Sequence, residues 1–231
     1  DRCLAAASDV ARVPRELPVD QAAMVRVNPP TALLMLREFV GLAPGDWVIQ
    51  NAANSAVGRC VIAVAKSRGL RTINVVRRPE LVAELEASGA EAVVCDDAGA
   101  LPDLRERTGG AKIRLALNAV GGESALRLAN QLAPGGVMVT YGAMGRQPLK
   151  IPNGLLIFKD LQFRGFWLTR WFRDADAIAR ARIIDEIAAM MQSGELRIPV
   201  AATYPLDAWK EAVAAASAGS RPGKILFTMS V

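Results

Sequence analysis

The sequence predicts an α/β protein built on a parallel sheet that is covered by helices on both faces. Short, almost entirely apolar segments, such as Trp47–Asn51, Thr72–Val76 and Leu115–Asn118, alternate with segments of helical periodicity. Strands that are buried on both faces are continuous apolar runs, whereas strands with one solvated face alternate apolar and polar residues. Regular alternation of such strands with helices is typical of doubly wound folds.

The predicted elements follow one another with short connections. Asn28-Pro-Pro-Thr31 begins a helix with Asn28 as candidate cap, and Pro44-Gly45 follows its end. Strands are then expected at 47–51, 72–76, 92–95, 115–118, 137–141 and 162–166, with helices at 55–67, 79–88, 101–108 and 124–132. Residues 1–27 are expected to be irregular, and the tail is expected to form a helix at 175–192, a strand at 200–204, a helix at 206–218 and a strand at 224–229.

The first predicted strand runs into a turn of small residues, Ala52-Ala-Asn-Ser-Ala-Val-Gly58. Only Gly58 stands where a glycine is needed for close helix–strand packing, but small side chains still let the backbone approach a pyrophosphate. The helix that follows offers unpaired N–H groups and a positive dipole end. The stretch predicts the first unit of a Rossmann-type dinucleotide-binding fold, and an ordinary strand-to-helix turn is the alternative.

Arg77 and Arg78 directly follow the second predicted strand, where an acidic residue would hold a ribose 2′-hydroxyl. A guanidinium gives a phosphate two parallel charge-assisted hydrogen bonds. The pair therefore predicts a 2′-phosphate, and so NADP rather than NAD. The alternative is a solvated pair of surface arginines.

Two further segments are candidates for the cofactor site. Tyr141-Gly-Ala-Met144 closes the fifth predicted strand, and the carboxyl ends of strands line the binding crevice of such sheets. Phe166-Trp-Leu168 is aromatic in a chain with few aromatic residues. It is expected to form a wall of a pocket for the nicotinamide and the acyl group. The alternative is an oligomer contact or the edge of a core strand.

Composition excludes several kinds of chemistry. The chain has no histidine, and Cys3, Cys60 and Cys95 are too far apart to form a C-x-x-C pair, so a Cys/His zinc site and His-dependent triads are not expected. The net charge of +5 is spread along the chain without interleaved aromatic residues, which favours small polyanions over nucleic acid. Neither a membrane span nor a signal peptide is expected.

These segments together resemble the medium-chain dehydrogenase/reductase superfamily, and within it the zinc-free, mitochondrial-type 2-enoyl thioester reductases. The resemblance extends from about residue 10 to the C-terminus and rests above all on specific strings. Among them are Gln50-Asn-Ala-Ala-Asn-Ser55, Leu117-Asn-Ala-Val-Gly-Gly122 and Arg164-Gly-Phe-Trp-Leu168, with Val27-Asn-Pro-Pro-Thr-Ala32 and Val139-Thr-Tyr-Gly-Ala-Met144 in support.

The resemblance implies NADPH-dependent reduction of a trans-2-enoyl thioester, on coenzyme A or acyl carrier protein, in fatty acid synthesis. It also implies a homodimer, in the cytoplasm of a bacterium or alternatively in the mitochondrial matrix. By motif, the cofactor would be contacted by Asn28, Asn54, Ser55, Ala56, Val57, Arg77, Arg78, Tyr141, Gly142, Ala143, Met144, Phe166, Trp167, Leu168 and Lys224. Trp167 is also the one candidate for a catalytic pocket wall, and the role of Arg78 is less well supported than that of Arg77.

The chain departs from the family at its beginning, because family members start with a GroES-like catalytic domain that is expected to be incomplete here. The resemblance therefore implies part of that domain or a linker at 1–27, the NADP-binding domain at 28–195 and a return to the catalytic domain at 196–231. The proton-donating tyrosine of the family has no counterpart in Tyr141 or Tyr204. A quinone or alkenal reductase and a noncatalytic NADPH-binding module are the alternative functions.

Overall fold

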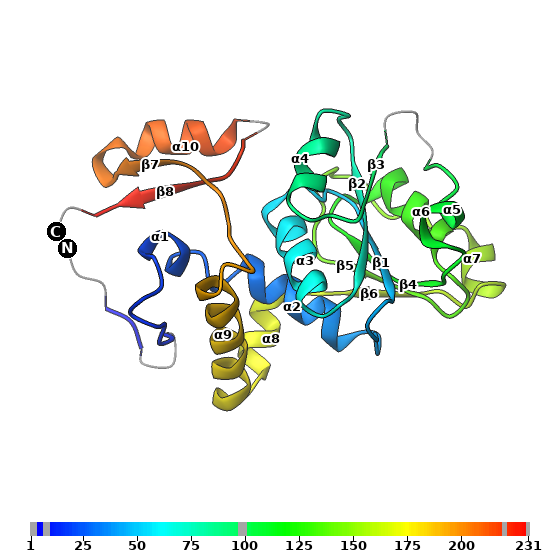
Figure 1. Cartoon of the computed structure of the whole chain (residues 1–231), viewed down its shortest axis with the longest axis horizontal. Helices are drawn as coiled ribbons and strands as arrows, with labels where there is room; N and C mark the ends of the chain where they lie inside the picture. Colours follow the sequence, from blue (N-terminus) through cyan, green and yellow to red (C-terminus); the bar gives the residue numbers. More distant parts are fainter. Residues whose placement is uncertain (1–3, 7–9, 97–100, 219–220, 230–231) are drawn as a thin grey trace. The chain divides into compact units, whose positions relative to one another are not determined.

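The computed structural model describes residues 4–6, 10–96, 101–218 and 221–229, and the chain forms two compact units. One unit comprises Thr31–Arg173, and the other combines Asp1–Pro30 with Asp174–Val231 (Figure 1). The first unit therefore ends before the boundary at residue 195 that the sequence suggested, because the long helix α9 (Ala177–Gln192) groups with the terminal segments.

The unit Thr31–Arg173 is built on a six-stranded parallel sheet of order β3-β2-β1-β4-β5-β6. This arrangement confirms the predicted doubly wound α/β fold. Its strands are β1 (Trp47–Gln50), β2 (Arg71–Val76), β3 (Ala92–Cys95), β4 (Ile113–Asn118), β5 (Val137–Thr140) and β6 (Gln162–Gly165).

Helices cover both faces of this sheet (Figure 1). The residues of β2 alternate between the faces: Ile73 and Val75 join one apolar cluster, and Val76 joins the other. The first cluster also receives Leu128, and the second receives Ile62. The helices of this unit are α3 (Ala56–Ser67), α4 (Leu81–Ala87), α5 (Arg105–Thr108), α6 (Gly122–Gln131) and α7 (Asn153–Ile157), while α2 (Asn28–Glu38) and α8 (Leu168–Asp174) cross its boundaries.

The other unit contains α1 (Val19–Ala22), α9, a parallel pair of strands and the helix between those strands. The side chain of Gln21 is buried and pairs with the backbone of Ile198 in both directions, donating to its oxygen at 3.1 Å and accepting from its nitrogen at 3.0 Å. This link joins segments that lie far apart in the sequence. The remaining elements are β7 (Val200–Pro205), a 3₁₀ turn η2 (Leu206–Ala208), α10 (Trp209–Ser217) and β8 (Lys224–Thr228).

Three short helices correct the predicted elements. Residues 1–27 were expected to be irregular, but α1 lies there, and α7 and α8 occupy segments for which no helix was predicted. These helices contain four, five and seven residues, so they are too short for helical periodicity to reveal. Within the described residues, no helix is long and apolar enough to cross a membrane.

Candidate functional site

The carboxyl ends of the strands in the unit Thr31–Arg173 carry the candidate site. The strands β1 to β3 follow one another toward one edge of the sheet, and β4 to β6 follow one another toward the other edge. The direction of strand addition therefore reverses between the neighbouring strands β1 and β4. Loops that leave the sheet at such a switch point diverge toward opposite faces and leave a crevice, which is where doubly wound proteins bind ligands. The loops concerned follow β1, β2, β4 and β5.

The loop after β1 is the turn of small residues that leads into α3. Ala52 adopts a left-handed backbone conformation with φ of 49°, and the Ser55 side chain caps the helix by accepting from the Gly58 amide at 3.1 Å. A Cβ atom on Gly58 would lie 2.5 Å from the Ala53 oxygen, so a glycine is required for this close packing. The packing role that the sequence assigned to Gly58 is therefore confirmed.

The first two amides of α3, those of Ala56 and Val57, donate no hydrogen bond to any described part of the chain. The amide of Ala53 donates to the Val75 oxygen at 3.3 Å, which brings the turn beside the carboxyl end of β2. Free amides and the positive end of the helix dipole suit an anion, because these N–H groups can donate to it without giving up an existing hydrogen bond.

The two predicted phosphate ligands at the end of β2 differ in their surroundings. Arg77 is exposed, and within the described residues its guanidinium makes no hydrogen bond or ion pair. Arg78 is partly buried and lies 3.5 Å from the carboxylate of Glu80. Of the two arginines, Arg77 is therefore the one whose guanidinium, within the described residues, is available to bind a ligand.

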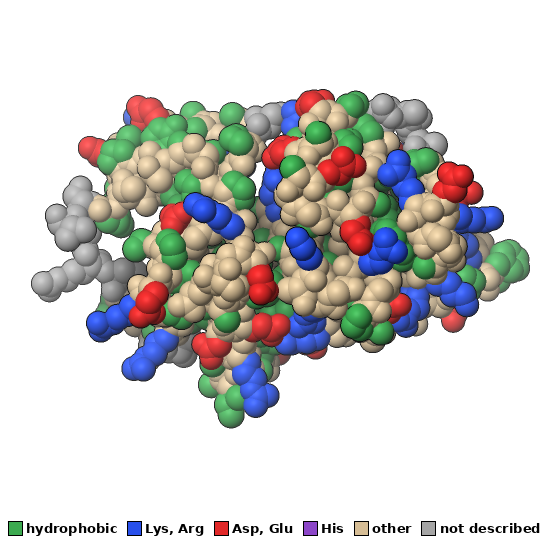
Figure 2. All heavy atoms as spheres, viewed as in Figure 1, with side chains coloured by type: hydrophobic (Ala, Val, Ile, Leu, Met, Phe, Trp, Pro, Cys, Tyr) green, Lys and Arg blue, Asp and Glu red, His purple; other side chains and the backbone are tan. Residues whose placement is uncertain are grey.

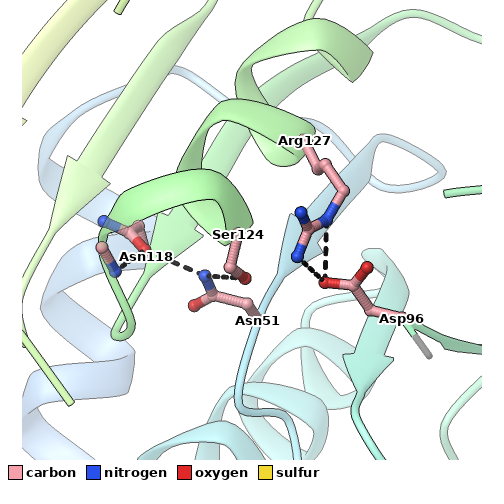
Figure 3. A network of polar contacts seen from close by, with 6 residues as sticks. Asn51, Asp96, Asn118, Ser124 and Arg127 are labelled. Carbon is pink, nitrogen blue, oxygen red and sulfur yellow. Dashed lines mark hydrogen bonds and ion pairs between the residues drawn. The ribbon is translucent and has the colours of Figure 1, made fainter. Parts of the chain in front are cut away.

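Buried amide side chains link the carboxyl ends of β1, β4 and β5 (Figure 3). Asn51 donates from Nδ2 to Asn118 Oδ1 at 2.9 Å and to Ser124 Oγ at 3.0 Å. Asn118 in turn donates from Nδ2 to Thr140 Oγ1 at 3.1 Å. These residues were not among the predicted site residues, although polar residues at the ends of apolar strands were a signal that could have shown them.

A second polar contact in the same region joins Asp96, after β3, to Arg127 on α6 (Figure 3). Arg127 Nε and Nη2 both donate to one oxygen of Asp96, at 3.0 and 2.6 Å. The Asp96 side chain is only 3% exposed, and its other oxygen has no hydrogen-bond partner among the described residues. Neither Asp96 nor Arg127 was among the predicted site residues.

The loop Tyr141–Met144 lies against the turn that follows β4. The Tyr141 amide donates to the Asn118 oxygen at 3.0 Å, and the Met144 amide donates to the Ala119 oxygen at 2.9 Å. A Cβ atom on Gly142 would lie 2.9 Å from the Ala119 oxygen, so the two loops approach closely. Ala143 and Met144 are exposed at the surface.

The Tyr141 hydroxyl is buried and, within the part of the chain that the structure describes, makes no hydrogen bond of acceptable geometry. Burial raises the pKa of the phenol well above its ordinary value, while the nearby side chain of Ser55 acts in the opposite direction. Tyr141 therefore places a neutral polar atom beneath the turn that begins α3, next to its capping residue.

The aromatic segment after β6 divides into buried and exposed parts. Phe166 packs edge-to-face against Phe39, with ring centroids 6.0 Å apart, whereas the side chain of Trp167 is 65% exposed. Leu168 is half-buried and begins α8. Asn28 and Lys224 belong to the other compact unit, so the site described above comes from the remaining predicted residues.

The residues of this chain do not fit a zinc site. The chain has no histidine, and the described residues contain no group of three or more Cys, Asp or Glu side chains that could hold a metal ion. Cys60 is buried and Cys95 is partly buried, while Cys3 lies outside the described residues. On the face shown in Figure 2, basic and acidic side chains are interspersed.

The fold and the site define a dinucleotide-binding α/β protein. A family model described as zinc-binding dehydrogenase matches residues 56–184, and the chain belongs to this family. This result confirms the resemblance to medium-chain dehydrogenases/reductases, although the family's name refers to a metal that the donor set here does not fit.

Individual relatives confirm the resemblance to mitochondrial-type enoyl thioester reductases. The chain is 43% identical to the human mitochondrial enoyl-[acyl-carrier-protein] reductase over 94% of its own length and 60% of that protein. The solved Etr1p/NADP/crotonyl-CoA complex is 34% identical with a TM-score of 0.81, over 92% of this chain and 62% of that one. The Etr1p/Etr2p heterodimer from Candida tropicalis is 35% identical with a TM-score of 0.77, over 87% and 60%.

Proposed function

We propose that this chain is the cofactor-binding part of an NADPH-dependent reductase of trans-2-enoyl thioesters, carried on coenzyme A or acyl carrier protein. The observation that carries the proposal is that, within the described residues, the first two amides of α3 and the guanidinium of Arg77 at the end of β2 make no hydrogen bond or ion pair. The chain spans 60% of the human enoyl reductase to which it is similar, and that enzyme's name supports the choice of substrate.

The residues fit an NADP molecule laid across the switch point. The amides of Ala56 and Val57, together with Asn54 and Ser55, would hold the diphosphate at the helix N-terminus. Arg77 would bind the 2′-phosphate through paired charge-assisted hydrogen bonds, and Arg78 would add to the positive potential there.

The nicotinamide half would lie along the loops after β5 and β6, since the second half of a doubly wound sheet binds the second nucleotide. Tyr141–Met144 and Phe166–Leu168 would form one wall, with Trp167 facing the substrate. The resemblance also implied cofactor contacts from Asn28 and Lys224, which belong to the other unit. Bound NADPH would supply the hydride for the β-carbon of the enoyl group.

The contribution of this chain is to bind and orient the cofactor, and we assign none of its tyrosines as the donor of the α-carbon proton. As the resemblance implies, we place the NADP-binding domain at residues 28–195 and parts of a GroES-like domain at residues 1–27 and 196–231. The Etr1p/Etr2p heterodimer supports a dimeric assembly, for which we propose two identical chains. A mitochondrial relative supports a matrix location, with bacterial cytoplasm as the alternative.

Calorimetric titration of the chain with NADPH and NADH tests the cofactor, and NADPH oxidation with crotonyl-CoA or a quinone tests the reaction. The reaction is measured with a complete catalytic domain supplied, either in the same chain or as a second chain. We expect tighter binding of NADPH and oxidation with crotonyl-CoA. Preference for the quinone would favour a quinone or alkenal reductase, and NADPH binding without turnover of either substrate would favour a noncatalytic module.

A further inference from the structure

The Asn118 side chain is the centre of the turn that follows β4. Its Oδ1 accepts three hydrogen bonds, from Asn51 Nδ2 at 2.9 Å and from the amides of Val120 and Gly121 at 3.1 Å each. Asn51 Oδ1 accepts from the Ala119 amide at 2.7 Å. Two side-chain amides thus satisfy three consecutive backbone N–H groups of one turn.

Both amide side chains are held in one orientation. Asn51 and Asn118 are 1% and 0% exposed, so water cannot replace a lost hydrogen bond. Asn51 uses both Nδ2 hydrogens, toward Asn118 and Ser124, and Asn118 reaches Thr140 from its own Nδ2. A buried network of this kind keeps its geometry because any rotation leaves a desolvated polar group unpaired.

The turn held by this network also supports the loop after β5. The Met144 amide donates to the Ala119 oxygen and the Gly145 amide to the Val120 oxygen, both at 2.9 Å. The Tyr141 amide donates to the Asn118 backbone oxygen at 3.0 Å. A displacement of the turn would therefore move the whole loop Tyr141–Met144.

We propose that Asn51 and Asn118 are positioning residues for the nicotinamide half of the cofactor, an inference that rests on the proposed NADPH-binding function. They touch the loops after β4 and β5, whereas the adenosine half would be held by β2, the start of α3 and Arg77. Loss of the network should therefore weaken contacts to one half of the dinucleotide and leave the other half intact.

The test compares NADPH with 2′,5′-ADP, which contains only the adenosine half of the cofactor. Asn51→Asp replaces the donating Nδ2 with an oxygen that faces Asn118 Oδ1, so the central hydrogen bond becomes a repulsion. We expect Asn51→Asp to weaken NADPH binding about tenfold or more and to leave 2′,5′-ADP binding within about twofold.

A milder variant keeps the test informative where Asn51→Asp does not fold. Ser124→Ala removes only one acceptor of Asn51 Nδ2 and should shift NADPH binding in the same direction by about threefold. The matched control is Gln21→Glu. Gln21 is a buried amide of the other unit whose Nε2 donates to the Ile198 oxygen at 3.1 Å, so the substitution makes the same change away from the proposed cofactor contacts.

The outcomes separate the two proposals. Selective loss of NADPH affinity in Asn51→Asp and Ser124→Ala, but not in Gln21→Glu, supports the positioning role. Equal loss of affinity for both ligands, or unchanged affinity for both, overturns it while leaving the proposed function intact. If the folded, unmutated chain binds neither ligand, the proposed function fails, and the positioning role fails with it.

Discussion

The carbonyl oxygen of Ala53 lies 2.5 Å from the position that a Cβ atom on Gly58 would occupy, and the Ala53 Cα lies 2.7 Å from that position. Both are backbone atoms, so no side-chain rotation can relieve the contact. We expect Gly58→Ala to lower the free energy of unfolding by about 1–3 kcal/mol, as overpacking of a well-packed site does. Chemical denaturation measures this change, and calorimetry should show weaker NADPH binding because the start of α3 moves.

Gly41→Ala is the control for that prediction. A Cβ atom at Gly41 would meet nothing within 4 Å, so the same substitution there removes a glycine without overpacking. We expect its free energy of unfolding to stay within about 0.5 kcal/mol of the unmutated chain. Equal stabilities of the two variants would show that the close approach at Gly58 is not restrictive.

The second prediction concerns cofactor choice. Arg77 is exposed and makes no ion pair within the described residues, so its charge is available to a 2′-phosphate. We expect NADPH to bind about tenfold or more tightly than NADH, and Arg77→Glu to reduce or invert this preference. Calorimetry with both cofactors measures the difference. Arg107→Glu, on the exposed side of α5, makes the same change of charge and should leave the preference unchanged.

The third prediction follows from the buried hydroxyl of Tyr141. Burial raises the pKa of this phenol, so the folded protein keeps the proton at a pH where the unfolded chain releases it. Stability should therefore fall as the pH rises above about 10, the ordinary value for tyrosine. In a Tyr204→Phe background, where Tyr141 is the only tyrosine, phenolate absorbance should appear only beyond that value. Ionisation of the folded protein at the ordinary pKa would contradict the burial of the hydroxyl.

Removal of the same hydroxyl provides an independent check. Tyr141→Phe deletes a buried oxygen that has no hydrogen-bond partner among the described residues, so we expect the free energy of unfolding to stay constant or to rise by about 1 kcal/mol. A clear loss of stability would indicate that the hydroxyl makes a hydrogen bond in solution. Thermal unfolding near neutral pH, where the phenol is neutral in both states, measures the effect.

Much of the fold followed from local sequence signals, but the polar contacts of the site did not. Gly58 could be assigned because strand, turn and helix are contiguous, so its neighbours in space are its neighbours in sequence. Asn51 and Asn118 are 67 residues apart, and they meet only because β4 crosses over to pair with β1. No local pattern fixes that pairing, and the edge-to-face contact of Phe39 with Phe166 could not be predicted for the same reason.

The fourth prediction concerns metal. The chain has no histidine, and the described residues offer no cluster of metal-binding side chains, despite the name of the family. We expect prolonged chelation to leave thermal stability and NADPH affinity unchanged, because neither the fold nor the proposed cofactor contacts depend on a metal ion. Elemental analysis of the untagged protein provides the check. Stoichiometric zinc, whose removal by the chelator also abolishes NADPH binding, would contradict this expectation.

The last prediction is that a polypeptide of residues 1–231 binds NADPH but reduces crotonyl-CoA poorly. Met144 and Trp167, both on the one proposed wall of the nicotinamide site, are 66% and 65% exposed. Hydride transfer requires a fixed orientation and exclusion of water, and positioning can account for about 7–11 kcal/mol of barrier reduction. A substrate that binds in a site with only one, exposed wall would lose most of that contribution to the rate. Supplying a complete catalytic domain, in the same chain or as a second chain, should raise the single-turnover rate, and Trp167→Ala should then lower this rate more than it weakens NADPH binding. Trp209→Ala, at an exposed tryptophan of the other unit, is the control, and efficient turnover by residues 1–231 alone would show that one wall is sufficient.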